Sequence, residues 1–148
     1  ADLATSLEEC HRLSEEVKGK VVLAFGSRIL KLDNQIKRKW YRFLLGRIVA
    51  TAISNTLELS VYDSQCGCKI FEFQTAKKIF DEPFISKWLF DVEIFFRMIH
   101  IFGRSDIQNH LREIPLKAWV DTPGSRVSPM YFFILWWDIF KISKKYKN

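Results

Sequence analysis

The chain has 148 residues, of which 48% are hydrophobic and 27% are charged, a balance typical of one folded globular domain. This composition excludes an intrinsically disordered tail. The 23 Lys and Arg residues outnumber the 17 Asp and Glu residues, and the formal net charge of +6 favours an anionic partner such as a phosphate, a nucleic acid or an acidic membrane surface. Because three cysteines is an odd number, we expect free thiols and a reducing compartment.

The N-terminal sequence, Ala1-Asp2-Leu3, has no initiator Met and none of the features of a signal peptide, so we expect the chain to be part of a longer protein. Its most apolar run, residues 130–137, is well short of the roughly 20 residues that span a bilayer, and no membrane-crossing segment is expected. No internal repeat or Gly/Ser/Pro-rich linker is present, which predicts a single unit over residues 1–148.

The first two elements are predicted to be a helix and a buried strand. Thr5 and Ser6 each stand three residues before a glutamate, a capping-box pattern, and the apolar residues that follow predict a helix ending near residues 18–19. The apolar run over residues 21–25 predicts a strand buried on both faces, with Gly26-Ser27-Arg28 at its carboxyl end.

The remaining elements are also predicted from periodicity. Residues 37–57 are typical of a long amphipathic basic helix, and a short strand (68–73), a short helix (75–80), a helix ended by Gly103 (89–102), a strand (112–120) and an aromatic helix with a lysine-rich end (128–145) follow. Pro115 lacks an amide hydrogen, which predicts a sheet edge or a bulge. Together the patterns predict an α/β half-sandwich with strands near Val21, Ile70 and Ile114 and four main helices.

Six short motifs follow one another along the chain. They are Ala1-Asp2, Gly26-Ser27-Arg28, Asp63-Ser64-Gln65-Cys66-Gly67-Cys68-Lys69, Lys87-Trp88-Leu89-Phe90-Asp91-Val92-Glu93, Glu113-Ile114-Pro115-Leu116-Lys117-Ala118-Trp119 and Gly124-Ser125-Arg126. Most lie near the ends of predicted elements, where α/β folds gather ligand contacts. In this order they resemble the C-terminal part of the catalytic domain of family 2 glycosyltransferases that act on polyprenyl phosphate, most closely the dolichyl-phosphate β-glucosyltransferases. Cys68 replaces an aromatic residue of the family pattern, Lys87 an arginine and Arg126 a lysine.

The resemblance implies a fold and a reaction. The fold is the C-terminal portion of a GT-A, or nucleotide-diphospho-sugar transferase, fold without its N-terminal nucleotide-binding part. The reaction is inverting transfer of glucose from UDP-glucose to dolichyl phosphate at the cytosolic face of the endoplasmic reticulum membrane, with mannose as the alternative sugar, and this piece alone is expected to be inactive. An Asp-x-Asp motif of the family holds Mg²⁺ or Mn²⁺ against the donor diphosphate, which makes Asp2 the expected metal ligand.

The resemblance also implies that cations hold the acceptor. Arg28 and Arg42 are expected to grip its phosphate, and Lys69 and Arg126 to add positive potential. Arg42 could equally lie on a solvated face of its helix and contact no phosphate. The second pKa of a phosphate monoester is about 6, so the acceptor oxygen is largely ionised at neutral pH and positioning matters more than a general base.

Three carboxylates are candidates for the catalytic role. Asp63 is expected to orient the acceptor or the donor, or to act as base, with Asp91 and Glu93 as the alternative pair. At i and i+2 on a helix, Asp91 and Glu93 cannot face the same way, so at most one should point into the cleft. Gln65 and Gly67 are expected to shape the turn so that the backbone approaches the ligand.

Two other functions are compatible with the charge. The basic helix and the aromatic C-terminal helix would also suit a non-catalytic membrane-surface module. Nucleic-acid binding is not expected, because the aromatic residues lie on apolar stripes and no nucleic-acid-binding signature is present. If an N-terminal half is absent, an open sheet edge and exposed apolar surface favour a homodimer.

Overall fold

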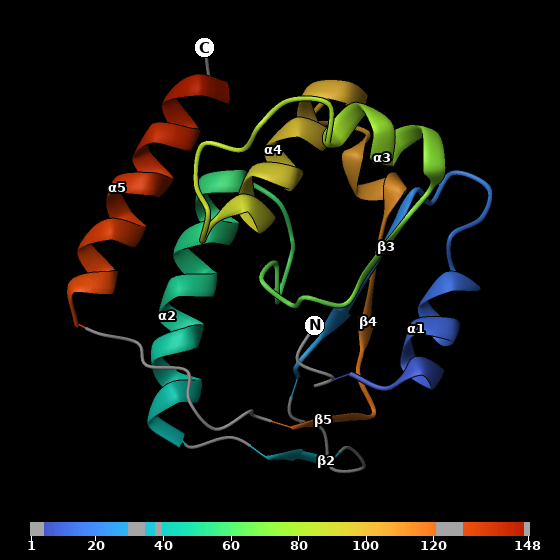
Figure 1. The fold of residues 1–148 in the computed structure, drawn as a ribbon, viewed down its shortest axis with the longest axis horizontal. Helices are drawn as coiled ribbons and strands as arrows, with labels where there is room; N and C mark the ends of the chain where they lie inside the picture. Colours follow the sequence, from blue (N-terminus) through green and yellow to red (C-terminus); the bar gives the residue numbers. More distant parts are fainter. Residues whose placement is uncertain (1–4, 30–34, 38–39, 121–128, 147–148) are drawn as a thin grey trace.

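The computed structural model describes residues 5–29, 35–37, 40–120 and 129–146. It confirms a mixed α/β chain (Figure 1). The elements in chain order are α1 (Leu7–Ser14), β1 (Leu23–Ser27), β2 (Gln35–Lys37), α2 (Trp40–Leu57), β3 (Lys69–Phe71), α3 (Phe73–Ile79), α4 (Phe90–Phe102), the short 3-10 helix η1 (Ile107–His110), β4 (Leu111–Pro115), β5 (Ala118–Val120) and α5 (Pro129–Tyr146).

The strand β1 is the centre of a three-stranded sheet with the order β3-β1-β4. It pairs antiparallel with β3 and parallel with β4. All five residues of β1 are buried, as the apolar run predicts, although the strand begins at Leu23, two residues later than expected. Because successive side chains of a strand point to opposite faces, Leu23 and Phe25 enter one core and Ala24 enters another.

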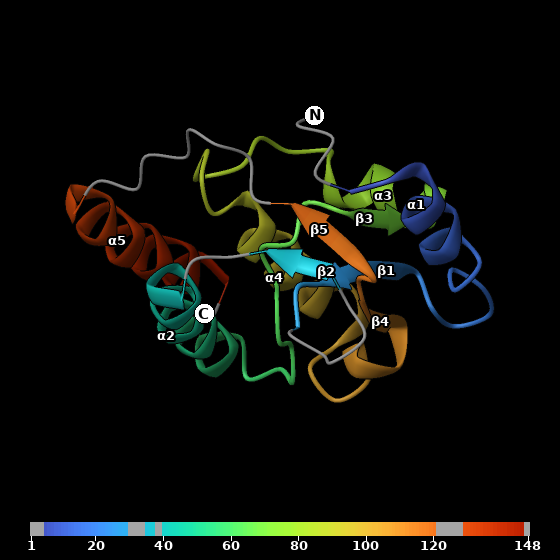
Figure 2. The ribbon, with the colours of Figure 1, turned by 90° about the horizontal axis from the view of Figure 1, so that it is seen from below.

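Helices cover the two faces of this sheet unequally (Figures 1 and 2). On one face, α2, α4 and α5 enclose the larger core, which includes Ile53, Phe95 and Ile142. On the other face, α1 covers a smaller core that includes Leu13 and Leu116. The carboxyl end of β1 therefore lies between two layers of helices, and Arg28 directly follows it.

Several predicted boundaries shift for identifiable reasons. Ser6 caps α1 by accepting a hydrogen bond from the Glu9 amide, as predicted, but the helix ends at Ser14, before the chain turns at Gly19 with a φ of +62°. Gly103, with a φ of +79°, follows the end of α4 as predicted. The long basic helix starts at Trp40 instead of residue 37, because β2 precedes it.

The predicted strand over residues 112–120 is two strands. The first, β4, pairs with β1 at the sheet edge, which confirms the expectation from Pro115. The second, β5, pairs in parallel with β2 in a separate two-stranded sheet. Local periodicity predicts neither β2 nor this change of partner, because such pairing joins residues far apart in the chain.

Candidate functional site

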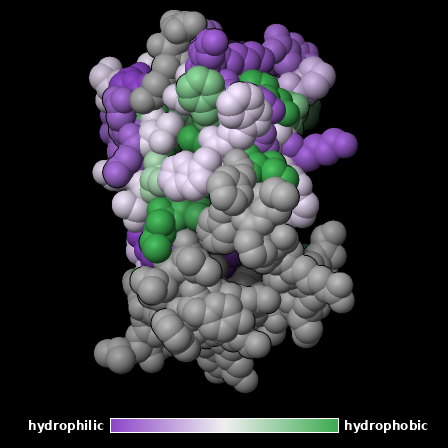
Figure 3. Space-filling model, turned by 90° about the vertical axis from the view of Figure 1, so that its left-hand side faces the viewer, coloured by the Kyte–Doolittle hydropathy of each residue, from purple (hydrophilic) through white to green (hydrophobic). Residues whose placement is uncertain are grey.

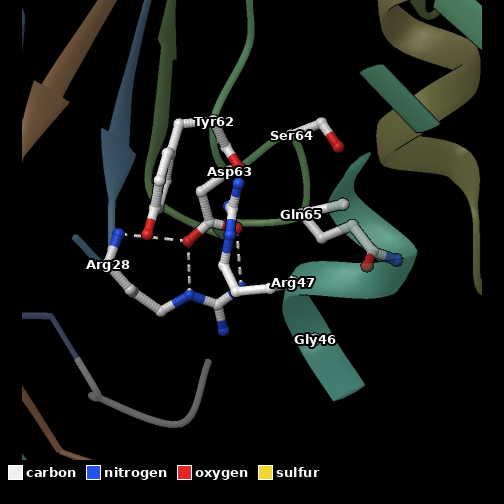
Figure 4. A pocket seen from close by; sticks show the side chains of 8 residues that line it. Arg28, Gly46, Arg47, Tyr62, Asp63, Ser64 and Gln65 are labelled. Atoms are coloured by element: carbon white, nitrogen blue, oxygen red, sulfur yellow. Dashed lines mark hydrogen bonds and ion pairs between the residues drawn. The ribbon is translucent and has the colours of Figure 1, made fainter. Parts of the chain in front are cut away.

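A small pocket of about 50 Å³ lies where the end of β1 faces α2 and the turn at residues 62–65 (Figure 4). Its lining residues are Arg28, Gly46, Arg47, Ala50, Tyr62, Asp63, Ser64 and Gln65. A liquid water molecule occupies roughly 30 Å³, and pockets for drug-sized ligands measure roughly 300–1,000 Å³. This pocket therefore fits a group of a few atoms, such as a phosphate, and not a nucleotide sugar.

Arg28 and Asp63 form a bidentate ion pair in this pocket. The Arg28 Nε donates to Oδ2 of Asp63 at 2.6 Å and Nη2 donates to Oδ1 at 2.8 Å, while the Arg28 amide donates to Oδ2 at 3.1 Å. Burial by itself raises the pKa of Asp63, but the hydrogen bonds and charge of Arg28 outweigh it, so this pKa lies below its ordinary value. Asp63 is therefore ionised at neutral pH and a weak proton acceptor, suited to orienting Arg28.

Glu113 of β4 holds the turn that carries Asp63. The amides of Tyr62 and Asp63 each donate to the Glu113 carboxylate at 2.8 Å. The bonded residues are 51 and 50 positions apart in the sequence, and the bonds hold the turn so that the Asp63 side chain faces Arg28. Glu113 lies in one of the six sequence motifs, but its sequence context predicts no role, because its hydrogen-bond partners are main-chain amides, which nearly every residue carries.

Gly26 allows the segment before β3 to cross β1 closely. A Cβ at this position would lie 2.8 Å from Cδ2 of Leu116 and 3.0 Å from Sγ of Cys66, and both of these side chains are buried. The Gly26 amide also donates to the Cys68 carbonyl at 2.9 Å. The glycine of the Gly-Ser-Arg motif is thus required by packing beside the pocket.

We expect Gly26→Ala to lower the free energy of unfolding by about 1–3 kcal/mol, because an added methyl group overpacks a filled core. Gly67→Ala is the matched control, since a Cβ at Gly67 meets no atom within 4 Å, and its effect should stay within about 0.5 kcal/mol. Urea unfolding of both variants measures the difference. Equal stabilities for the two variants would contradict the packing argument. None of the described atoms lies close enough to require glycine at position 67, and the expected approach of its backbone to the ligand stays a prediction.

Arg47 of α2 lines the pocket, although the sequence motifs do not predict a role for it. Its Nη1 donates to the Tyr62 carbonyl at 2.9 Å, and its Cζ lies 3.6 Å from the centroid of the Tyr62 ring. Figure 4 shows Arg28 and Arg47 reaching the same turn from different elements. Sequence spacing identified α2 as basic but could not tell which of its arginines faces β1. Arg42 also lies on α2, and its side chain is outside the described part of the chain.

Lys69 and Asp91 form a second ion pair beside the pocket. The Lys69 Nζ donates to Oδ1 of Asp91 at 2.6 Å and to the Cys66 carbonyl at 2.7 Å. The two side chains are only 5% and 12% exposed. The charge of Lys69 contributes to the low pKa of Asp63. Neither Lys69 nor Asp91 lines the pocket itself.

Glu93 faces a different set of partners from Asp91, as their spacing predicts. Its fully buried carboxylate accepts hydrogen bonds from Arg97 at 2.9 Å, from the Tyr146 hydroxyl at 2.9 Å and from the Ile85 amide at 2.8 Å. Arg97 binds three main-chain carbonyls as well, those of Ile79, Glu82 and Pro83. Glu93 therefore joins α4 to α5 and to the loop before α4, and it does not line the pocket.

Two predicted site residues, Asp2 and Arg126, lie outside the described residues. Among the residues that the structure does describe, no group of three or more His, Cys, Asp or Glu side chains could hold a metal ion. Of the eight predicted site residues, the structure brings Arg28 and Asp63 together in the pocket, and it sets Lys69 and Asp91 beside them.

No family model matches the chain, and no solved structure matches it significantly. It is 33% identical over 111 residues to the dolichyl-phosphate β-glucosyltransferase of Saccharomyces cerevisiae, an alignment covering 74% of this chain and 31% of the relative. The enzymes of the same name from Drosophila melanogaster and Homo sapiens are 27% and 26% identical over 141 residues, covering 84% and 90% of this chain and 41% of each relative. The chain thus spans less than half the length of these relatives. The matches confirm the resemblance inferred from the motifs: over most of its length, the chain is a relative of the dolichyl-phosphate β-glucosyltransferases.

Proposed function

We propose that this chain forms the acceptor-binding part of an enzyme that transfers glucose from UDP-glucose to dolichyl phosphate with inversion. The observation that carries the proposal is the pocket that both Arg28 and Arg47 line. The Arg28 guanidinium is held by the Asp63 carboxylate, and the Arg47 guanidinium is held by the carbonyl and ring of Tyr62. The names of the relatives support the choice of sugar and acceptor. The mixed sheet with one antiparallel strand is compatible with the C-terminal portion of a GT-A fold, which is part of the proposal.

In this proposal, the two arginines bind the oxygens of the acceptor phosphate. Guanidinium groups match phosphate oxygens through paired hydrogen bonds. The phosphate oxygen then attacks the anomeric carbon of glucose from the side opposite the leaving UDP, and a single displacement of this kind inverts the configuration. Because the phosphate is already largely ionised near pH 7, Asp63 acts by holding Arg28 in place and not by removing a proton.

The donor side of the proposal depends on residues outside the described part. We place Mg²⁺ or Mn²⁺ at Asp2 on the strength of the motif alone, and such an ion neutralises charge on the diphosphate leaving group. On the acceptor side, Arg42 is proposed to help bind the acceptor phosphate, and Arg126 to add positive potential near the phosphates. Lys69 has its charge balanced by Asp91, so its proposed role is to stabilise the wall of the site.

An apolar surface on α2 and α5 supports placing this part of the enzyme at a membrane surface (Figure 3). We propose the cytosolic face of the endoplasmic reticulum membrane, as the resemblance to the family implies. Trp137 and Phe140 of α5 are 59% and 56% exposed. A shallow groove of about 460 Å³ between the two helices is lined by Asn55, Thr56, Trp136, Ile139, Phe140 and Ser143. The exposed lysines 141, 144 and 145 follow on α5, and an apolar face bordered by lysines suits an anionic lipid surface. No helix in the described part of the chain is long and apolar enough to cross a bilayer.

We expect the double variant Trp137→Ser, Phe140→Ser to bind vesicles of phosphatidylcholine and phosphatidylserine at least about tenfold more weakly. Full burial of one large apolar side chain contributes about 1.5–3 kcal/mol, and about 1.4 kcal/mol corresponds to tenfold. Phe73→Ser is the matched control, because Phe73 is 65% exposed on α3, away from this surface. Vesicle sedimentation measures the binding. Equal losses for both changes would contradict a membrane contact through α5.

The proposed reaction is tested with the full-length protein that contains this chain, UDP-glucose and dolichyl phosphate. We expect a glucosyl lipid whose formation depends on both substrates and on a divalent metal ion. Substituting GDP-mannose tests the alternative sugar, and the lipid product made from it would overturn the glucose assignment. Vesicle binding without transfer from either donor would favour the membrane-surface module.

A further inference from the structure

The structure places two cysteine thiols from distant parts of the chain side by side. Sγ of Cys10, on α1, lies 3.8 Å from Sγ of Cys68, which directly precedes β3. The two residues are 58 positions apart in the sequence. All three cysteines of the chain are free thiols, and Cys66 is buried in the same small core as Cys68. The proposed transfer reaction assigns no role to these sulfur atoms.

The two thiols of the pair differ in their access to solvent. Cys10 is partly exposed, whereas Cys68 is buried. Burial, followed by the hydrogen bond and the charge of Cys10, raises the pKa of Cys68 to about 12. A dissolved oxidant therefore reaches Cys10 first, and Cys68 remains a protonated thiol until a reactive sulfur is placed beside it.

We propose that Cys10 and Cys68 are an oxidisable pair that closes to a disulfide in the presence of a small disulfide oxidant such as oxidised glutathione. The Cys10 thiolate attacks one sulfur of the oxidant and expels the first glutathione thiolate. Cys68 then gives up its proton, attacks the Cys10 sulfur of the mixed disulfide and expels the second glutathione thiolate. In total, the two protein thiols lose two electrons and two protons, and the oxidant is reduced to two molecules of glutathione.

This crosslink would join α1 to the segment that leads into β3. That segment holds Cys66, which packs against Gly26, and the first residue of β3 after it is Lys69, which pairs with Asp91. Closure of the pair therefore restrains one wall beside the pocket. With the pair open, α1 is held by packing and by two hydrogen bonds, from Arg12 to the Pro115 carbonyl and from the Lys117 amide to Glu9. The proposal concerns the thiols themselves and stands whether or not the chain belongs to a glucosyltransferase.

The test is to equilibrate the protein with oxidised glutathione, block the remaining thiols by alkylation and map the peptides by mass spectrometry. We expect the peptide containing Cys10 to be joined to the peptide containing Cys68, with two of the three thiols of this chain lost and both recovered on reduction. Cys66 and Cys68 lie in one tryptic peptide, so Cys66→Ser makes the assignment unambiguous and should preserve the crosslink. Cys68→Ser, which keeps Cys66 in that peptide, should abolish it.

Two results would overturn the proposal. One is that all three thiols stay reduced at equilibrium in oxidised glutathione. The other is a disulfide of the native sequence that joins Cys66 to either of the other two cysteines. The map of the native sequence decides between these outcomes by itself, through fragmentation between Cys66 and Cys68, so a variant that folds poorly does not remove the test.

Discussion

In the proposed glucosyltransferase of which this chain is a part, Arg28→Ala should raise the dolichyl phosphate concentration needed for half-maximal rate at least about tenfold. It should leave the requirement for UDP-glucose nearly unchanged. A hydrogen bond to a charged group contributes about 1.5–3 kcal/mol, and about 1.4 kcal/mol corresponds to tenfold. The change also removes the partner of Asp63, whose carboxylate is buried. Steady-state kinetics with each substrate varied in turn measure the effect.

The controls separate phosphate binding from stability. Arg112→Ala removes an exposed arginine that pairs with Glu16 at 3.9 Å on the surface, and it should leave both substrate requirements unchanged. Arg47→Ala should act in the same direction as Arg28→Ala, because both guanidinium groups line the pocket. Unchanged acceptor saturation in Arg28→Ala, with folding intact by thermal unfolding, would remove Arg28 from the acceptor site. Near-normal turnover in Asp63→Asn would remove the orienting role of Asp63.

Arg97→Met should lower the free energy of unfolding by about 3–5 kcal/mol, the largest stability loss that we expect in this chain. The variant leaves the fully buried Glu93 carboxylate without its cationic partner, and removing one member of a buried ion pair costs this much. It also abolishes the hydrogen bonds to the carbonyls of Ile79, Glu82 and Pro83 that fix the loop before α4. Chemical denaturation with a two-state fit measures the loss.

A second variant, Glu93→Gln, tests the role of Glu93 when its stability and its rate of transfer are both measured. If Glu93 is structural, Glu93→Gln should lower stability and leave the rate per folded molecule largely intact. If Glu93 is catalytic, the rate should collapse while the unfolding midpoint stays close to that of the native protein, and our assignment would then be wrong. Arg112→Ala again serves as the control, because breaking an exposed ion pair should cost less than about 1 kcal/mol.

Much of the fold follows from local sequence. The apolar run before Gly26 fixes a buried strand, and Ser6 and Gly103 mark helix ends that the structure confirms. These signals are local because caps and periodicity involve residues no more than about four positions apart. The pairing of β2 with β5 was not predicted, since each strand has three residues and its partner lies more than 80 positions away. Neither strand is long enough to show a pattern of its own.

For the candidate site too, some features follow from the sequence and others depend on the tertiary structure. The sequence by itself determined the residue types and their order, from Gly26-Ser27-Arg28 to Glu113, and this order was enough to identify the relatives. Only the tertiary structure decided that Asp63 orients Arg28, that Arg47 lines the pocket, and that Glu93 belongs to a buried network with Arg97. The physical reason is that hydrogen bonds and ion pairs depend on distances of about 3 Å between atoms, and a folded sheet sets these distances between segments far apart in the chain.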